Sequence, residues 1–230
     1  MKHAYNLKSF GNNIKIDCNI ENLESIKFKK FKKFEKLEIT NSITRGKGSS
    51  YGDSSLNSNK TFLTENLNEI DFFDTKNGII KCGSGVSIEK LLPIIVNSGW
   101  FLPVTPGSKK ISIGGMVASN VHGKNQHIEG CFHNFVLSID LLGKNKKILT
   151  CSKFKNKILF DYTLGGMGLT GIILSASIKL KKIYSSKIIQ KTNVLNNINQ
   201  IVEDMKKNTY DYTVSWIDFN HNKSRGIIFY

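Results

Sequence analysis

The sequence predicts an α+β protein, and three observations lead to that prediction. The chain has 230 residues, of which 40% are hydrophobic, so it can bury a core as one large domain or as one domain and part of another. Segments with helical and strand periodicity follow in the order helix, strand, strand, helix, with short connections. A β-hairpin pattern comes further along the chain. This irregular order is typical of the α+β class.

The first half of the chain carries one well-defined helix signal. Ser87 is a suitable N-cap for a helix from Ile88 to Asn97, and Glu89 places an acid in the first turn, where the helix dipole favours it. Leucine, isoleucine and phenylalanine spaced among lysines also predict an amphipathic helix over residues 21–36. The expected extended segments are 39–44, 78–82 and 100–105, with a polar loop after residue 53.

The second half contains a hairpin, a short helix and a long strand. The expected hairpin strands are 135–142 and 147–151, joined by a turn at residues 143–146. A short helix near 155–162 precedes a strand over 172–180. Beyond residue 181 we expect a helix at 194–207 and strands at 210–219 and from 225 onward. Because the chain ends inside a strand pattern, the sequence predicts a C-terminally truncated protein.

The composition is strongly basic. Lysine and arginine total 33 against 18 acidic residues, which gives a net charge of +15, yet only Arg45 and Arg225 are arginines. A nucleic-acid reader depends on the bidentate arginine fork, so we expect no nucleic-acid partner and treat most of the lysine excess as background. Four dispersed cysteines and the lack of a long apolar run predict a soluble, cytoplasmic protein and leave open a peripheral contact with a membrane.

One glycine cluster matches a well-known fingerprint in the wrong context. Gly166-x-Gly168-x-x-Gly171 has the spacing of the dinucleotide-binding motif. That motif requires a helix after the glycines, because the pyrophosphate sits at the helix N-terminus. Here the β-branched segment 172–178 follows instead. We therefore reject a nicotinamide-binding strand–helix–strand unit for this part of the chain.

Two further glycine clusters suit an extended phosphate-bearing ligand. Residues 45–53 place three glycines and two serines directly after a strand, an arrangement that can form an anion nest for a diphosphate, with Arg45 adding a charge-assisted contact. The alternative is a sharp surface turn. Residues 106–123 add paired glycines among apolar residues, as expected where backbone approaches a flat ligand. Three such clusters in order favour the ligand-binding interpretation.

At these residues the chain resembles a known family. The motifs Arg45-Gly-x-Gly-x-Ser-Tyr-Gly-Asp53, Ile113-Gly-Gly-x-Val-Ala-Ser-Asn-Val-His-Gly-Lys-Asn125 and Gly165-Gly-x-Gly-Leu-Thr-Gly171 are similar to those of the PCMH-type FAD-binding domain of the vanillyl-alcohol-oxidase superfamily. Within it, the block 121–125 and the later Trp216-Ile-Asp218 most resemble the decaprenylphosphoryl-ribose oxidase family, followed by the sugar-lactone oxidases. The resemblance extends over about residues 10–219.

The resemblance implies a two-lobed FAD-binding domain over residues 1–181, with lobes at about 1–103 and 104–181. Residues 182–230 would then be the incomplete start of an α+β substrate or cap domain. The first glycine cluster would wrap the pyrophosphate, and the second would continue that cradle and lie along the flavin. Ile172 would contact the adenosine half. The implied FAD contacts are Thr44, Arg45, Gly46, Lys47, Gly48, Ser49, Ser50, Tyr51, Gly52, Asp53, Gly107, Ser112, Ile113, Gly114, Gly115, Ser119, Asn120, Val121, His122 and Ile172.

One departure from the superfamily pattern predicts how the cofactor is held. Members with covalently attached flavin often carry Gly-His-Ser in the first glycine cluster, whereas this chain has Gly48-Ser49-Ser50. Ser49 cannot form a histidyl link. The sequence therefore predicts FAD that is bound without a covalent bond.

The histidines suggest catalysis more than metal binding. His122, His127 and His133, with Cys131 among them, are spaced too loosely for a structural zinc site, and we expect no metal. The functional interpretation is that a sugar secondary alcohol gives hydride to flavin N5 while a nearby base accepts the hydroxyl proton. His122 is the candidate near flavin and substrate, and Lys124 the candidate that orients sugar or phosphate. In the resembling family, further flavin and substrate contacts come from the C-terminal part. The catalytic base would lie there if it is absent from this chain.

The resemblance implies an enzyme of cell-wall or surface-polysaccharide precursor synthesis. Such a FAD-dependent oxidoreductase would oxidise a polyprenyl-phosphate pentose, a lipid-linked sugar, to its 2′-keto form, and a separate NAD(P)H-dependent reductase would be its partner. Three alternatives stay open. They are an aldonolactone oxidase, a basic binding module for nucleic acid or an acidic membrane without turnover, and a truncated relic that binds FAD without turnover.

Overall fold

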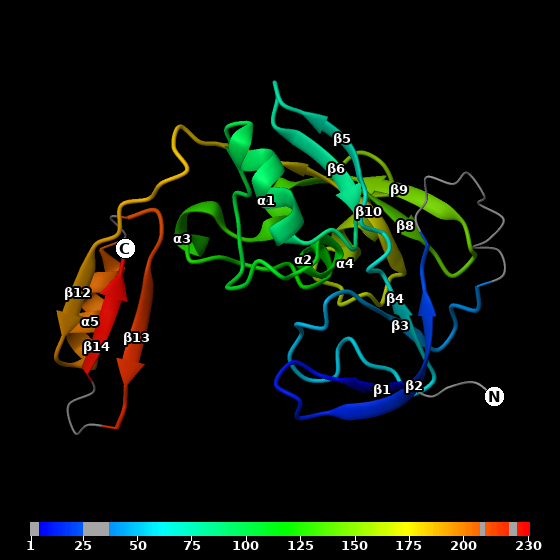
Figure 1. The fold of residues 1–230 in the computed structure, drawn as a ribbon, viewed down its shortest axis with the longest axis horizontal. Helices are drawn as coiled ribbons and strands as arrows, with labels where there is room; N and C mark the ends of the chain where they lie inside the picture. Colours follow the sequence, from blue (N-terminus) through cyan, green and yellow to red (C-terminus); the bar gives the residue numbers. More distant parts are fainter. Residues whose placement is uncertain (1–4, 25–36, 208–209, 221–224) are drawn as a thin grey trace.

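The computed structural model describes residues 5–24, 37–207, 210–220 and 225–230, and its first element is a four-stranded sheet (Figure 1). Its strand order is β1 (Tyr5–Lys8), β2 (Lys15–Asn22), β4 (Lys60–Leu63) and β3 (Ser42–Arg45). β1 runs antiparallel to β2, whereas β4 runs parallel to both β2 and β3. The fully buried Phe62 of β4 anchors a small core cluster on this sheet.

The predictions for this region were partly right. β3 confirms the strand expected at 39–44, although it begins later. The helix expected at 21–36 begins inside β2, which ends at Asn22, and residues 25–36 lie outside the described part of the chain. The strands β1, β2 and β4 were not predicted from the sequence. β4 pairs with strands that lie well before it in the chain, whereas β1 and β2 pair with each other.

The central element is a five-stranded antiparallel sheet. Its order is β5 (Ile70–Asp74), β6 (Ile79–Gly83), β10 (Ile172–Lys179), β8 (Val136–Leu142) and β9 (Ile148–Ser152). β10 lies in the middle, with β6 on one side and β8 on the other. The strands expected at 78–82, 135–142, 147–151 and 172–180 are confirmed. β5 and β6 precede residue 103, yet they belong to the same sheet as β10, β8 and β9, which follow it. The two large sheets therefore do not divide the chain at the boundary expected near residue 103.

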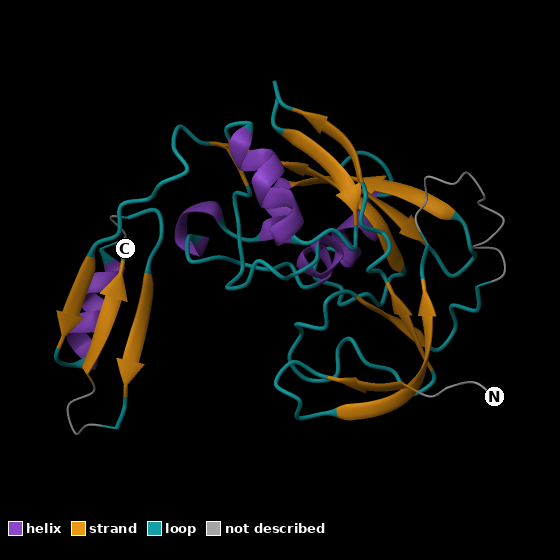
Figure 2. Cartoon of the chain, in the orientation of Figure 1, coloured by secondary structure: helices purple, strands orange, loops and turns teal. Residues whose placement is uncertain are grey.

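Short helices pack near this sheet (Figure 2). α1 (Ile88–Asn97) begins as predicted, because the Ser87 side chain accepts a hydrogen bond from the Lys90 N–H. α2 (Ile113–Ala118), the short helices α3 (Gln126–Glu129) and η2 (Phe132–Phe135), and α4 (Lys157–Thr163) follow. The two-stranded pair of β7 (Trp100–Phe101) with β11 (Lys181–Lys182) completes this part. The structure thus confirms the α+β class.

A small sheet with one helix ends the chain. β12 (Thr192–Leu195), β14 (Arg225–Phe229) and β13 (Val214–Asp218) are paired in that order, and α5 (Ile198–Lys206) contacts them. In Figure 1 this unit stands to one side of the two larger sheets. The helix expected from residue 194 begins later, because residues 192–195 pair with β14 and Asn197 caps α5. In the described residues no helix has the length and apolar character needed to cross a membrane.

Candidate cofactor-binding site

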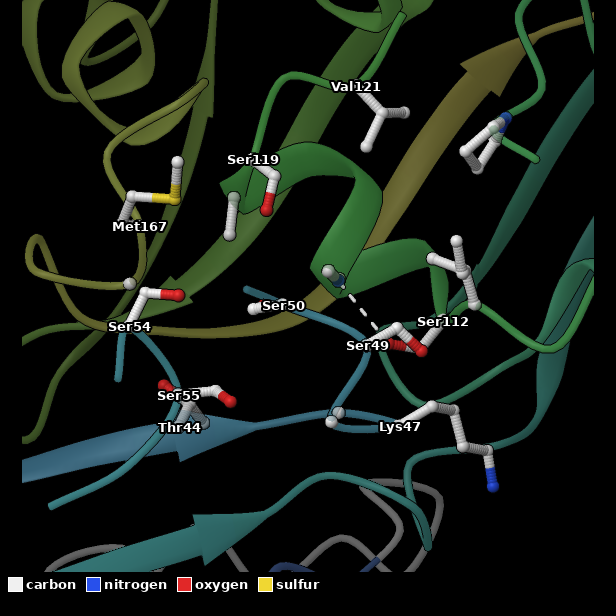
Figure 3. A pocket seen from close by; sticks show the side chains of 18 of the residues that line it. Thr44, Lys47, Ser49, Ser50, Ser54, Ser55, Ser112, Ser119, Val121 and Met167 are labelled. Atoms are coloured by element: carbon white, nitrogen blue, oxygen red, sulfur yellow. Dashed lines mark hydrogen bonds between the residues drawn. The ribbon is translucent and has the colours of Figure 1, made fainter. Parts of the chain in front are cut away.

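A cavity of about 720 Å³ opens between the two larger sheets. One wall is the glycine-rich loop, defined here as residues 46–55, which leaves β3. The opposite wall is α2 with the residues that precede and follow it. Figure 3 shows the hydroxyls of Ser49, Ser50 and Ser54 on the first wall, and Ser119 with Val121 on the second. Backbone and small polar side chains therefore form much of the cavity surface.

The glycine-rich loop presents unused hydrogen-bond donors. In the described part of the chain, no group accepts a hydrogen bond from the backbone N–H groups of residues 47–53. Gly48 and Gly52 have φ angles of +65° and +62°, a conformation that residues with a Cβ rarely adopt. The Lys47 ammonium lies 3.4 Å from Glu65 at the edge of the loop. A run of free N–H groups beside a cavity is the arrangement of an anion nest.

The second wall approaches the first very closely. A Cβ on Gly46 would lie 2.2 Å from the Ser112 Oγ, and one on Gly114 would lie 2.6 Å from the Ser84 Cβ. Ser112 caps α2, and its Oγ accepts from the Gly115 N–H at 3.4 Å, drawn as a dashed line in Figure 3. Glycine at 46 and 114 is therefore a packing requirement of this site.

The third glycine cluster closes another side of the cavity. The Met167 N–H donates to the Ala118 carbonyl at 2.9 Å, which ties this cluster to the end of α2. A Cβ on Gly168 would lie 3.6 Å from the Thr44 Oγ1 on β3. Strand β10 follows these glycines, so the structure confirms the rejection of a strand–helix–strand dinucleotide unit.

Most of the sequence-predicted cofactor contacts lie on the cavity surface. They come from both walls, although the residues are up to 78 positions apart in the chain. The predicted residues that line the cavity are Thr44, Gly46, Lys47, Gly48, Ser49, Ser50, Tyr51, Gly107, Ser112, Gly114, Gly115, Ser119, Asn120, Val121 and His122.

Five other predicted cofactor contacts do not line the cavity. Gly52 and Asp53 are exposed beyond its edge, and Ile113 is fully buried on the core face of α2. Ile172 packs in the core cluster around Phe62, while the adjacent Ile173 lines the cavity, because successive strand residues face opposite sides. The fifth, Arg45, is bonded elsewhere, as described below.

Several lining residues were missed by the sequence analysis. Phe10 comes from the turn between β1 and β2, and Ser84 follows β6, so neither belongs to a recognised motif. Ser54 and Ser55 lie just beyond the first motif and could have been found by extending it. The remaining missed residues are Thr64, Pro106, Ser108, Ile111, Ala118, Met167, Gly168, Gly171 and Ile173.

The two candidate catalytic residues differ in position. His122 is exposed and lines the cavity. Lys124 is exposed but is not among the lining residues, and its carbonyl accepts a hydrogen bond from the Thr213 N–H at 2.9 Å. Directly after Lys124 the loop is held by Asn125, which is 1% exposed and donates to the Pro103 carbonyl at 2.8 Å.

The other two histidines in the described part of the chain have structural contacts. His127 Nε2 lies 2.9 Å from the Tyr210 carbonyl, and His133 Nδ1 lies 3.1 Å from the Asn120 Oδ1. Across the described residues, no group of three His, Cys, Asp or Glu side chains gathers as a metal ion would require.

These features define an FAD-binding domain, and the comparison with family models agrees. Residues 37–152 match the model of the FAD binding domain family, so the chain belongs to that family. Its cofactor is FAD.

The chain is also similar to individual proteins. The chain is 32% identical over 181 residues to decaprenylphosphoryl-beta-D-ribose oxidase of Mycolicibacterium smegmatis, over 76% of this chain and 39% of that protein. It is 28% identical to a D-lactate dehydrogenase of Archaeoglobus fulgidus, over 51% of this chain and 27% of the relative. It is 25% identical to the Delta(24)-sterol reductase of Rattus norvegicus, over 50% of this chain and 22% of the relative. The chain thus spans about two fifths or less of these relatives.

The residues present fit FAD. Ser84 lines the cavity, and its buried hydroxyl has no hydrogen-bond partner in the described structure, so it has hydrogen-bonding capacity left. A Cβ on Gly107 would meet nothing within 4 Å, which leaves the backbone there open to a close approach. Together with the N–H groups of residues 47–53, which have no acceptor among the described residues, these features suit the diphosphate of FAD.

Proposed function

We propose that this chain supplies the FAD-binding part of an oxidoreductase that oxidises a secondary alcohol of a sugar. The preferred substrate is a polyprenyl-phosphate pentose, which would become its 2′-keto form. The N–H groups of residues 47–51, which line the cavity and have no acceptor among the described residues, carry the cofactor half of this proposal in a member of the FAD binding domain family. The 32% identity to a decaprenylphosphoryl-beta-D-ribose oxidase supports the substrate half.

The chain's own residues have distinct tasks in this proposal. Residues 47–51 hold the diphosphate through their N–H groups, and Ser84 adds a hydroxyl. Gly107 and the α2 wall, with Gly114 and Gly115, allow the ligand to lie against backbone. When bound, FAD supplies the acceptor for the hydride that leaves the alcohol carbon.

The polar residues beside the cavity act on the substrate. His122, exposed on the cavity surface, takes up the proton released by the alcohol, or holds the hydroxyl toward another base. Lys124, two residues on, orients the sugar or its phosphate by charge. Residues 1–181 form the FAD-binding domain in this proposal, and 182–230 begin a substrate domain. A separate NAD(P)H-dependent reductase would consume the keto sugar.

The absence of a covalent flavin link is directly testable. Ser49 lines the cavity at the position where covalent members of the superfamily carry histidine, and a serine hydroxyl offers no histidyl bond. We expect acid precipitation of the FAD-loaded chain to release the yellow colour into the supernatant. The measurement is visible absorbance of supernatant and pellet, with free FAD as control. Colour retained in the pellet would show that the link is covalent.

The substrate class is tested by anaerobic reduction of the FAD-loaded chain. We expect a polyprenyl-phosphate pentose to bleach the visible flavin absorbance and an aldonolactone to leave it unchanged. Bleaching by the lactone alone would favour an aldonolactone oxidase. A chain that stays colourless after incubation with FAD would contradict the cofactor assignment itself.

A further inference from the structure

We propose that Arg45 is a positioning residue, which sets the shape of the glycine-rich loop before FAD binds and does not touch the diphosphate. The proposal rests on the proposed function, because it takes this loop to hold the diphosphate. It replaces the sequence-based expectation of a direct, charge-assisted contact between Arg45 and the phosphates.

The Arg45 guanidinium is hydrogen-bonded within the chain, and Arg45 itself does not line the cavity. One terminal nitrogen donates to the Lys8 carbonyl at 2.7 Å, and the other donates to the Ser55 Oγ at 3.0 Å. Lys8 ends β1 and Ser55, which is 8% exposed, ends the glycine-rich loop. Arg45 is absent from the residues that line the cavity. Its planar fork therefore joins both ends of the loop to β1.

Gly48 and Arg45 are packed as a matched pair. A Cβ on Gly48 would lie 2.1 Å from a terminal nitrogen of Arg45 and 2.5 Å from its central guanidinium carbon. The guanidinium plane thus lies against the loop backbone at the point where Gly48 takes its positive φ. Burial is the largest influence on this side chain and lowers the pKa of Arg45 from its usual value. A guanidinium still stays protonated there, so both hydrogen bonds are charge-assisted.

The turn after β1 adds two contacts to the same loop. The Phe10 N–H donates to the Ser50 carbonyl at 3.3 Å, and the Phe10 and Tyr51 rings meet edge to face at 5.3 Å. The Arg45 backbone is itself fixed, because its carbonyl accepts from the Thr64 N–H at 3.1 Å. The loop is therefore held from outside, while its own N–H groups stay available. Such preorganisation lowers the ordering cost of binding.

The test compares three variants in the absence and presence of FAD. Arg45→Gln removes the charge and the fork, Arg45→Lys keeps the charge, and Ser55→Ala removes one acceptor. Deuterium uptake by peptides covering residues 46–55 is measured in the apoprotein, and FAD affinity by quenching of flavin fluorescence at several salt concentrations. For Arg45→Gln we expect faster exchange of the loop before FAD is added, and an affinity about 10- to 100-fold weaker.

The expected pattern separates positioning from direct contact. Arg45→Lys should recover part of the affinity, and Ser55→Ala should lose about 3- to 10-fold. The salt dependence of FAD binding should stay unchanged in all three, since no phosphate contact is lost. Lys47→Gln is the matched control, because it removes an equal charge from the neighbouring residue without breaking the bonds to Lys8 and Ser55. It should leave loop exchange in the apoprotein unchanged.

Two results would overturn the proposal. One is unchanged loop exchange in the Arg45→Gln apoprotein, whatever happens to affinity. The other is a weaker affinity together with a weaker salt dependence, which would indicate a direct phosphate contact. If Arg45→Gln also speeds deuterium uptake in peptides from β8 and β10, the substitution has loosened the whole fold. The uptake of the loop in Ser55→Ala then decides the role of Arg45. If the unaltered chain binds no FAD, the proposed function fails, while apoprotein exchange still decides the role of Arg45.

Discussion

Replacing Gly114 by valine is expected to abolish FAD binding at ordinary cofactor concentrations. Gly114 lies in α2, where its N–H donates to the Ser84 carbonyl at 2.8 Å. Any Cβ at this position would lie 2.6 Å from the Ser84 Cβ and 3.0 Å from the Ser84 carbonyl oxygen. The Ser84 N–H donates to the Leu174 carbonyl on β10 at 2.9 Å, so residue 84 is held in place. The valine must therefore push α2 out of place.

The size of this effect follows from overpacking. Extra atoms in a closely packed site cost about 1–3 kcal/mol, and every 1.4 kcal/mol is about tenfold in affinity. Because Gly114 lies in the cavity wall, we expect a loss of about 100-fold in FAD affinity, measured by fluorescence quenching. The unfolding temperature of the apoprotein, measured by circular dichroism, should fall as well.

Gly107→Ala is the matched control for this prediction. Both glycines line the cavity, but a Cβ on Gly107 would meet nothing within 4 Å. We expect its apoprotein to unfold at the temperature of the unaltered chain. A Gly114→Val protein with unchanged FAD affinity would show that FAD binding does not need the close packing of α2 against Ser84.

Replacing Asp140 by alanine is expected to destabilise the central sheet. The Asp140 carboxylate on β8 accepts from Lys81 Nζ on β6 at 2.6 Å and from Ser175 Oγ on β10 at 2.8 Å. It also accepts from Thr150 Oγ1 on β9 at 2.8 Å. One carboxylate thus connects four strands of the central sheet. Its removal should lower the free energy of unfolding by about 2–4 kcal/mol, measured in urea.

The same contacts predict a pH dependence. Burial by itself would raise the pKa of Asp140, but the hydrogen bonds from Lys81, Thr150 and Ser175 outweigh it and lower the pKa below its usual value. A carboxyl whose pKa is lower in the folded than in the unfolded state stabilises the fold above its unfolded-state pKa, about 3.9, and loses that contribution as pH falls through the folded-state pKa. We therefore expect the difference in stability between the unaltered chain and Asp140→Ala to be full near neutral pH and to shrink below about pH 4.

Asp161→Ala is the control for the Asp140 prediction. Asp161 also pairs with a lysine, Lys157, but on the exposed surface of α4, with a side chain that is 51% exposed. Exposed pairs of this kind contribute about 0.3–0.5 kcal/mol. If both variants lose the same small amount, the four-strand connection by Asp140 does not stabilise the sheet as proposed.

Local signals explain which elements could be predicted. α1 was predicted with its cap and both ends, because Ser87 and the apolar spacing lie within one short stretch. The hairpin of β8 and β9 was found for the same reason, since its turn joins two neighbouring strands. β4 and β5 were mistaken for loop, because β4 pairs with β2 and β3 and β5 begins beyond a run of polar residues. Strands like β4 become recognisable only once their partners are known.

The sequence by itself determined the family and the cofactor class, because both follow from residue types within short motifs. The tertiary structure alone decided which side each of the motif residues faces. It places Ile173 on the cavity and its neighbour Ile172 in the core, and it turns Arg45 toward Lys8 and Ser55. The physical reason is that orientation depends on partners far away in the chain, whereas a motif records only its own neighbours.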